Sequence, residues 1–113
     1  MPFIRITSNK EITKKDVNFM TMEFGVGIEC IEGKTEAWIM LEFKGDALMA
    51  FGGSDAPCAM VEVDLFGAAS EADKSAFTNS VCHIVNFVLD IPPERIYVRY
   101  LETDTWGYNH TNF

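Results

Sequence analysis

Apolar residues recur along this chain with the spacing of two amphipathic helices. Between Thr13 and Ile31, and again between Ser70 and Val88, they lie three and four positions apart, which places them on one helical face. Each stretch opens with a Ser or Thr followed three residues later by Asp16 or Asp73, a pattern that resembles a capping box. The second stretch is stopped by the proline pair at 92–93. The pattern therefore predicts two helices.

Glycines make the first helix the weaker of the two predictions. Gly33 is placed to end it, because helices often terminate with glycine in a left-handed conformation. Gly25 and Gly27 fall inside it, where each glycine costs about 1 kcal/mol relative to alanine.

Runs rich in β-branched and aromatic residues flank both predicted helices. The order along the chain is strand, helix, strand, given twice. The four predicted strands are Phe3–Thr7, Ala37–Phe43, Ala59–Leu65 and Arg95–Leu101.

The two halves of the chain match at a constant offset. Ser70 follows Thr13 by 57 residues, and the same offset carries the run 38–41 onto 95–98. We interpret this as an internal duplication within one domain of 113 residues, with repeats at about 2–45 and 58–102.

This order predicts an α+β fold made of two βαβ units. Right-handed crossovers would place both helices on one face of a four-stranded mixed sheet. The other face would carry Trp38, Met40, Tyr97 and Leu101, which are unfavourable in water. Further subunits are therefore expected to cover it, although the pattern alone fits a dimer as well as a trimer.

Composition removes several classes of function. A net charge of −8 opposes binding to nucleic acid, which needs clustered Lys and Arg. No apolar run approaches the roughly 20 residues of a membrane-spanning helix, and no signal peptide is evident, so we expect a cytoplasmic protein without membrane insertion. The three cysteines form no CxxC pair and the two histidines have no ligand spacing, so neither a metal nor a cofactor is expected.

Several ordered blocks resemble the family of macrophage migration inhibitory factor (MIF) and D-dopachrome tautomerase. The resemblance runs nearly from end to end with little insertion. Its blocks are Met1-Pro2, Gly33-Lys34, Met49–Ser54, Pro57–Ala59, Pro93–Tyr97, Trp106–Asn109 and the final Phe113. It implies a homotrimer whose sheets surround a central channel, with active sites at the subunit interfaces.

The resemblance also implies a site for each matched position. Pro2 would be the catalytic N-terminal proline, Lys34 a substrate-contacting lysine, and Phe66 a position whose backbone N–H touches substrate. Tyr97 and Arg99 would reach the pocket from the neighbouring subunit. Aromatic side chains would line the pocket at Trp38, Trp106, Tyr108 and Phe113.

Four departures from a well-known member of the family change these expectations. That member has Asn at Arg99, Tyr near Trp38, Ile at Phe66 and a second cysteine at Val61. Loss of that thiol removes CxxC oxidoreductase chemistry. Arg99 keeps a hydrogen-bond donor but adds charge and reach, so the preferred substrate is expected to differ.

The chemistry implied for Pro2 is that of an isomerase, a phenylpyruvate tautomerase that interconverts keto and enol groups. Such an enzyme needs a base with a near-neutral pKa. An α-amino group titrates near ~7.7 to 8.0, and burial lowers that value. Met1 must first be removed, because an acylated proline nitrogen is not basic. The substrate would be small, anionic and enolisable, such as phenylpyruvate or a D-dopachrome-type compound.

Other interpretations of the same residues stay open. Lys34 could complement the dipole of the preceding helix, Arg99 could form an ion pair, and Trp106 and Tyr108 could pack at a subunit interface. The resemblance also leaves open a cytokine-like protein that is secreted without a signal peptide and binds a cell-surface receptor. A third possibility is a proline-dependent hydratase or dehalogenase of the same superfamily.

Overall fold

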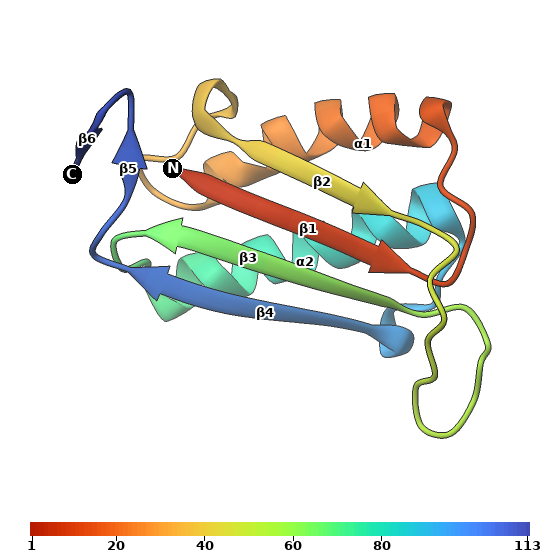
Figure 1. Ribbon diagram of the computed structural model, residues 1–113. Coiled ribbons are helices and arrows are strands. Elements are labelled where there is room, and N and C mark those ends of the chain that lie inside the picture. Colours follow the sequence, from red (N-terminus) through yellow and green to blue (C-terminus); the bar gives the residue numbers. More distant parts are fainter.

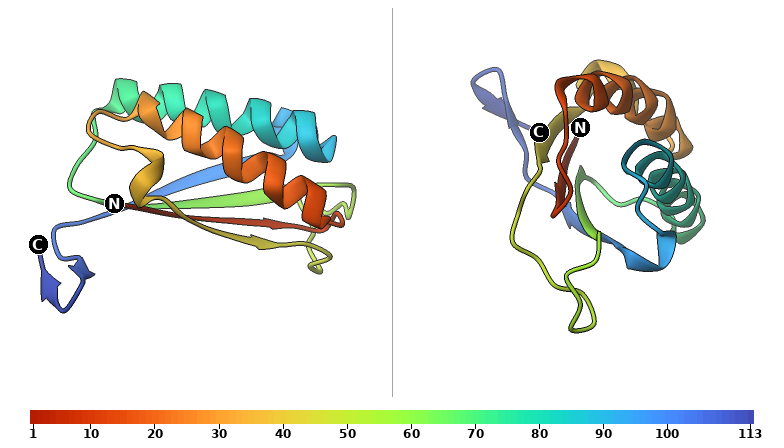
Figure 2. Two further views of the ribbon diagram at one scale, coloured as in Figure 1. Left: turned by 90° about the horizontal axis from the view of Figure 1, so that it is seen from above. Right: turned by 90° about the vertical axis from the view of Figure 1, so that its right-hand side faces the viewer.

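A computed structural model describes residues 1–113. Four strands form one sheet, and two helices lie side by side across one of its faces (Figures 1 and 2). Neither helix is long and apolar enough to cross a membrane. The elements are β1 (Pro2–Ser8), α1 (Lys14–Gly27), β2 (Met40–Lys44), β3 (Ala59–Phe66), α2 (Glu71–Leu89) and β4 (Ile96–Thr103).

The sheet has the strand order β2-β1-β3-β4. Helix α1 connects the parallel pair β1 and β2, helix α2 connects the parallel pair β3 and β4, and the central pair β1 and β3 is antiparallel. The predicted α+β fold, with a mixed sheet covered on one face, is therefore confirmed. The ladder partners Phe3 and Met40 in one unit correspond at the 57-residue offset to Met60 and Tyr97 in the other.

Helix α1 begins where the capping box predicts. The Thr13 hydroxyl accepts a hydrogen bond from the backbone N–H of Asp16, and the Asp16 carboxylate accepts one from the N–H of Thr13. The helix ends at Gly27, earlier than Ile31, and continues as a 3-10 turn. A Cβ at Gly27 would lie 2.8 Å from the Ser80 hydroxyl of α2, so close helix packing explains a glycine here.

Helix α2 agrees closely with its prediction. The Ser70 hydroxyl accepts a hydrogen bond from the N–H of Asp73. The helix ends at Leu89 because Asp90 adopts a left-handed conformation with φ 56°, two residues before the proline pair.

The strand predicted over 37–43 begins late. Residues Glu36–Trp38 form a 3-10 turn, and β2 starts only at Met40. The physical reason is the length of β1: Met40 pairs with Phe3, and β1 itself begins at Pro2, so the earlier residues have almost no strand to pair with. Trp38 therefore lies on a turn at the sheet's end rather than on the sheet.

A short hairpin at the C-terminus was not predicted. Its strands are β5 (Gly107–Tyr108) and β6 (Thr111–Asn112), joined by Asn109 and His110, which both have positive φ. Asn favours that conformation in tight turns, which was the available signal. The hairpin lies beyond the same end of the sheet as the N-terminus (Figure 1).

The two faces of the sheet differ sharply. The helix side holds one apolar core, to which α1 and α2 contribute Phe24 and Phe77 with ring centroids 6.5 Å apart. The opposite face leaves Met40, Tyr97 and Leu101 more than half exposed. As the sequence indicates, this face carries apolar side chains that one chain cannot bury.

Replacing Phe77 by Ala should lower the free energy of unfolding by about 3–5 kcal/mol, because its fully buried ring would leave a cavity beside Phe24. Phe87 on the same helix is 76% exposed, so Phe87→Ala is the matched control and should cost under about 1 kcal/mol. Urea denaturation at one protein concentration measures both. Equal losses would contradict this placement of the core.

Candidate active site

Pro2 opens the central strand of the sheet. It is buried, and it pairs with Leu65 of the antiparallel neighbour β3. This pairing places the N-terminus beside the residue that ends β3, which is Phe66. The backbone N–H of Phe66 donates to the Met1 carbonyl oxygen over 3.2 Å.

Lys34 reaches the same point from the turn after α1. Gly33, with φ 80°, redirects the chain there, and the Lys34 ammonium donates a 2.8 Å hydrogen bond to the Phe66 carbonyl oxygen. An ammonium has three donors, so this bond leaves others for a second partner. The sequence-predicted residues Pro2, Lys34 and Phe66 thus meet in one chain.

This environment disfavours charge on the N-terminal amine. Burial, followed by the hydrogen bond and positive charge of Lys34, lowers the pKa of the Met1 amine from 8.0 to about 6. An amine held here is therefore largely neutral at pH 7. In this structure Met1 precedes Pro2, so the amine that titrates belongs to Met1.

Aromatic rings extend from Phe66 along one end of the molecule. The Phe66 ring lies 5.8 Å from Phe113, which stacks at 6.4 Å on Tyr108, and Tyr108 meets Trp38 edge-on at 5.2 Å. Trp38, Tyr108 and Phe113 are each about half exposed. The 3-10 turn before β2 and the C-terminal hairpin thereby form an aromatic wall next to the N-terminus.

Trp106 contributes to this end of the molecule through its backbone. Its carbonyl oxygen accepts a 2.9 Å hydrogen bond from the N–H of Phe113, which fixes the end of the chain against the hairpin. The structure records no ring contact between Trp106 and the other aromatic residues.

Tyr97 and Arg99 lie elsewhere in the same chain. Pro2 is in register with Leu65 and then Glu102, so Tyr97 is five residues farther along β4, or about 17 Å at the rise of a strand. Tyr97 instead packs on Phe51, with ring centroids 4.7 Å apart. One chain therefore does not bring Tyr97 or Arg99 to Pro2.

Arg99 has a partner within its own chain. Its guanidinium donates to the Glu62 carboxylate over 2.6 Å, and its side chain is 51% exposed. The alternative interpretation of Arg99 as an ion-paired residue thus has a structural counterpart within the subunit.

The sequence model of the family described as macrophage migration inhibitory factor (MIF) matches residues 1–113. The chain belongs to the MIF family. It is 30% identical to macrophage migration inhibitory factor of Xenopus laevis over 83 residues, which are 72% of each chain. The crystal structure of Leishmania major MIF2 superposes with a TM-score of 0.94 at 29% identity, covering 100% of this chain and 97% of that one. A MIF-like protein of Entamoeba histolytica shares the fold, with a TM-score of 0.86 at 19% identity over 99% of this chain and 98% of that one.

Arg95 is a structural determinant of this MIF-family chain that sequence reasoning did not single out. It lies in the 3-10 turn before β4, and its guanidinium donates to four backbone carbonyls of the 51–57 loop at 2.9 to 3.2 Å. It also lies 5.1 Å from the ring centre of Phe51. Arg95 therefore fixes the loop that supports Tyr97. Its signals in the sequence were its place at the start of the predicted strand Arg95–Leu101 and within the block Pro93–Tyr97 that resembles the MIF family.

Replacing Arg95 by Lys should loosen this loop, because lysine keeps the charge but cannot make the fork of hydrogen bonds. Amide hydrogen exchange at Phe51 and Ser54, whose N–H groups close the turn, should rise by about tenfold or more. Peptides from the core of α2 provide the internal control and should be unchanged. Unaltered exchange in the loop would contradict the role given to Arg95.

Proposed function

We propose that this chain, once Met1 is removed, is a keto–enol tautomerase acting on small anionic α-keto acids of the phenylpyruvate type. Pro2 is the catalytic base. Active sites lie between the subunits of a homotrimer, where Tyr97 and Arg99 of one subunit complete the pocket around Pro2 of the next.

The observation that carries the proposal is the environment of the N-terminal amine. With Met1 in place, the Met1 amine lies in a setting beside Lys34 that lowers its pKa to about 6, and the Met1 carbonyl accepts from the backbone N–H of Phe66. Removal of Met1 would give Pro2 the free amine at the start of β1, beside the same lysine. A base that is neutral at pH 7 and flanked by a cation suits proton transfer from an anionic substrate.

The reaction requires only proton transfers, one from carbon and one to oxygen. In the keto-to-enol direction, the Pro2 nitrogen takes a proton from the carbon next to the carbonyl, and the released electron pair forms the carbon–carbon double bond. The carbonyl oxygen gains electron density and takes a proton from water, and the protonated Pro2 amine returns its proton to water. The reverse steps restore the keto form. Lys34 and Tyr97 would donate hydrogen bonds to the substrate's oxygens. The rings of Phe66 and Phe113 would hold its apolar part.

The open face of the sheet supports the assembly. Met40, Tyr97 and Leu101 are 66%, 62% and 52% exposed in the single chain, an arrangement that favours coverage by further subunits. Assembly would also supply the Tyr97 and Arg99 that one chain keeps about 10 to 17 Å along the sheet from Pro2. The resemblance to the MIF family favours three subunits.

Replacing Pro2 by Gly should lower kcat/KM for the enol-to-keto conversion of phenylpyruvate by about a hundredfold or more, because a positioned secondary amine is lost. Protein that retains Met1 should be equally impaired, since its Pro2 nitrogen is an amide. The absorbance of the enol measures the rate. Native mass spectrometry of the oligomer confirms that each variant assembles. Full activity in either form would refute the proline mechanism.

The proposed base also predicts the pH dependence. Below the pKa of the Pro2 amine, kcat/KM should fall tenfold per pH unit because the base becomes protonated, and the midpoint should lie below the roughly 7.7 to 8.0 of an ordinary α-amino group. Lys34→Met should move this midpoint upward, since a neighbouring positive charge that lowers the pKa has been removed. Lys44→Met, on the far end of β2, is the matched control. A midpoint unmoved by Lys34→Met would contradict the placement of Lys34.

A further inference from the structure

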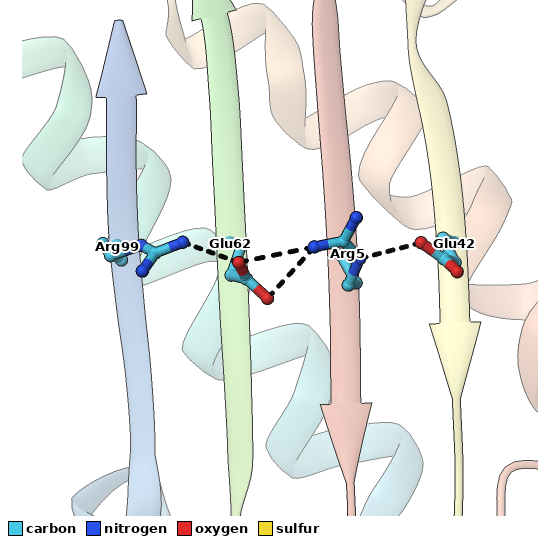
Figure 3. A network of polar contacts seen from close by, with 4 residues as sticks. All are labelled: Arg5, Glu42, Glu62 and Arg99. Carbon is cyan, nitrogen blue, oxygen red and sulfur yellow. Dashed lines mark hydrogen bonds and ion pairs between the residues drawn. The ribbon is translucent and has the colours of Figure 1, made fainter.

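Four charged side chains form one row across the whole sheet on the face away from the helices. In order they are Glu42 of β2, Arg5 of β1, Glu62 of β3 and Arg99 of β4 (Figure 3). Ion pairs connect each neighbour: Arg5 to Glu42 at 2.8 Å, Arg5 to Glu62 at 3.5 Å, and Arg99 to Glu62 at 2.6 Å. With two arginines and two glutamates, the row has no net charge.

The row follows the two-fold repetition of the chain with its charges reversed. The 57-residue offset carries Arg5 onto Glu62 and Glu42 onto Arg99, and the ladder places all four in register. Because the charges are reversed between the two halves, each residue of the row has the opposite charge to its neighbour on the adjacent strand. Each half of the chain therefore contributes one glutamate, and each glutamate pairs with an arginine on the adjacent strand.

Glu62 is bound mainly to Arg99. Arg5 is held chiefly by Glu42, whose hydrogen bond is the largest of the influences that raise the pKa of Arg5. The contacts of Arg5 with the Glu62 carboxylate are 3.5 Å long, whereas the hydrogen bond from Arg99 to Glu62 is 2.6 Å long. The Glu62 side chain is only 23% exposed, compared with 51% for Arg99, so water screens this carboxylate less than the arginine.

We propose that Glu62 is a specificity-determining positioning residue that holds Arg99 and offsets its charge at the substrate. Any carboxylate bound by Arg99 must lie close to the Glu62 carboxylate, and the two negative charges repel each other. Arg99 then acts as a hydrogen-bond donor with little net attraction for anions. Arg99 consequently contributes little to any preference for keto acids over uncharged enolisable carbonyl compounds. This inference rests on the proposed function, in which Arg99 completes the pocket.

The test compares phenylpyruvate with its uncharged methyl ester. The wild-type protein supplies the reference ratio of the two KM values. Glu62→Gln keeps the size of the side chain but removes its charge, so the KM for the acid should fall about three- to tenfold while the KM for the ester changes less than about twofold. The kcat values should change little, because Glu62 does not touch the reacting atoms.

Matched variants separate this role from general damage. Glu42→Gln removes the carboxylate at the far end of the row, which does not contact Arg99, and should leave the acid-to-ester ratio unchanged. In an Arg99→Gln background, Glu62→Gln should have no further effect on the ratio, since it acts through Arg99. A purely structural role would shift both substrates together.

A binding measurement keeps the inference independent of turnover. Calorimetric titration with 3-phenylpropanoate and its amide should show about three- to tenfold tighter binding of the carboxylate to Glu62→Gln and unchanged binding of the amide. An unchanged acid-to-ester ratio in Glu62→Gln would overturn the inference while leaving the tautomerase proposal intact. Absence of turnover with the predicted binding shift would instead refute the tautomerase proposal alone.

Discussion

The antiparallel ladder between β1 and β3 determines where each functional group lies. It pairs Pro2 with Leu65, so the N-terminus lies beside Phe66, and the helix that follows each strand adds β2 and β4 outside this central pair. The same ladder places Ala59 with Ser8 at the opposite end, where Tyr97 and its supporting loop are found. One register thus separates the chain into an end that carries the amine and an end that carries Tyr97.

This separation supports the proposed assembly of several subunits. The N-terminal end offers a depressed amine pKa, a lysine and an aromatic wall. Arg99 and Tyr97 project from the uncovered face of the sheet, which one chain cannot bury. Subunits that cover this face would bring the two ends together, so stability and catalysis would depend on the same contact. The charged row spans that face and contributes no net charge to it.

The helices and the strand order could be predicted because their signals are local. Capping residues at Thr13 and Ser70 marked both helix starts, and the 57-residue offset implied the paired units. The late start of β2 could not be predicted, since it depends on where β1 begins. The hairpin that carries Tyr108 had one local signal, Asn109 in its turn. At the site, the meeting of Pro2, Lys34 and Phe66 followed from the family resemblance. The anchoring by Arg95 and the partner of Arg99 depend on distances that only folding defines.

Mixing two inactive variants tests most directly whether the active site is shared between subunits. One variant carries Pro2→Gly, the other carries Tyr97→Phe with Arg99→Ala, and they are unfolded together and reassembled at equal amounts. If each site takes Pro2 from one subunit and Tyr97 and Arg99 from its neighbour, about a quarter of the sites in random trimers are intact, and that fraction of wild-type activity should return. If mixed trimers form and activity stays at the level of the separate variants, every site lies within one chain, and the account is wrong.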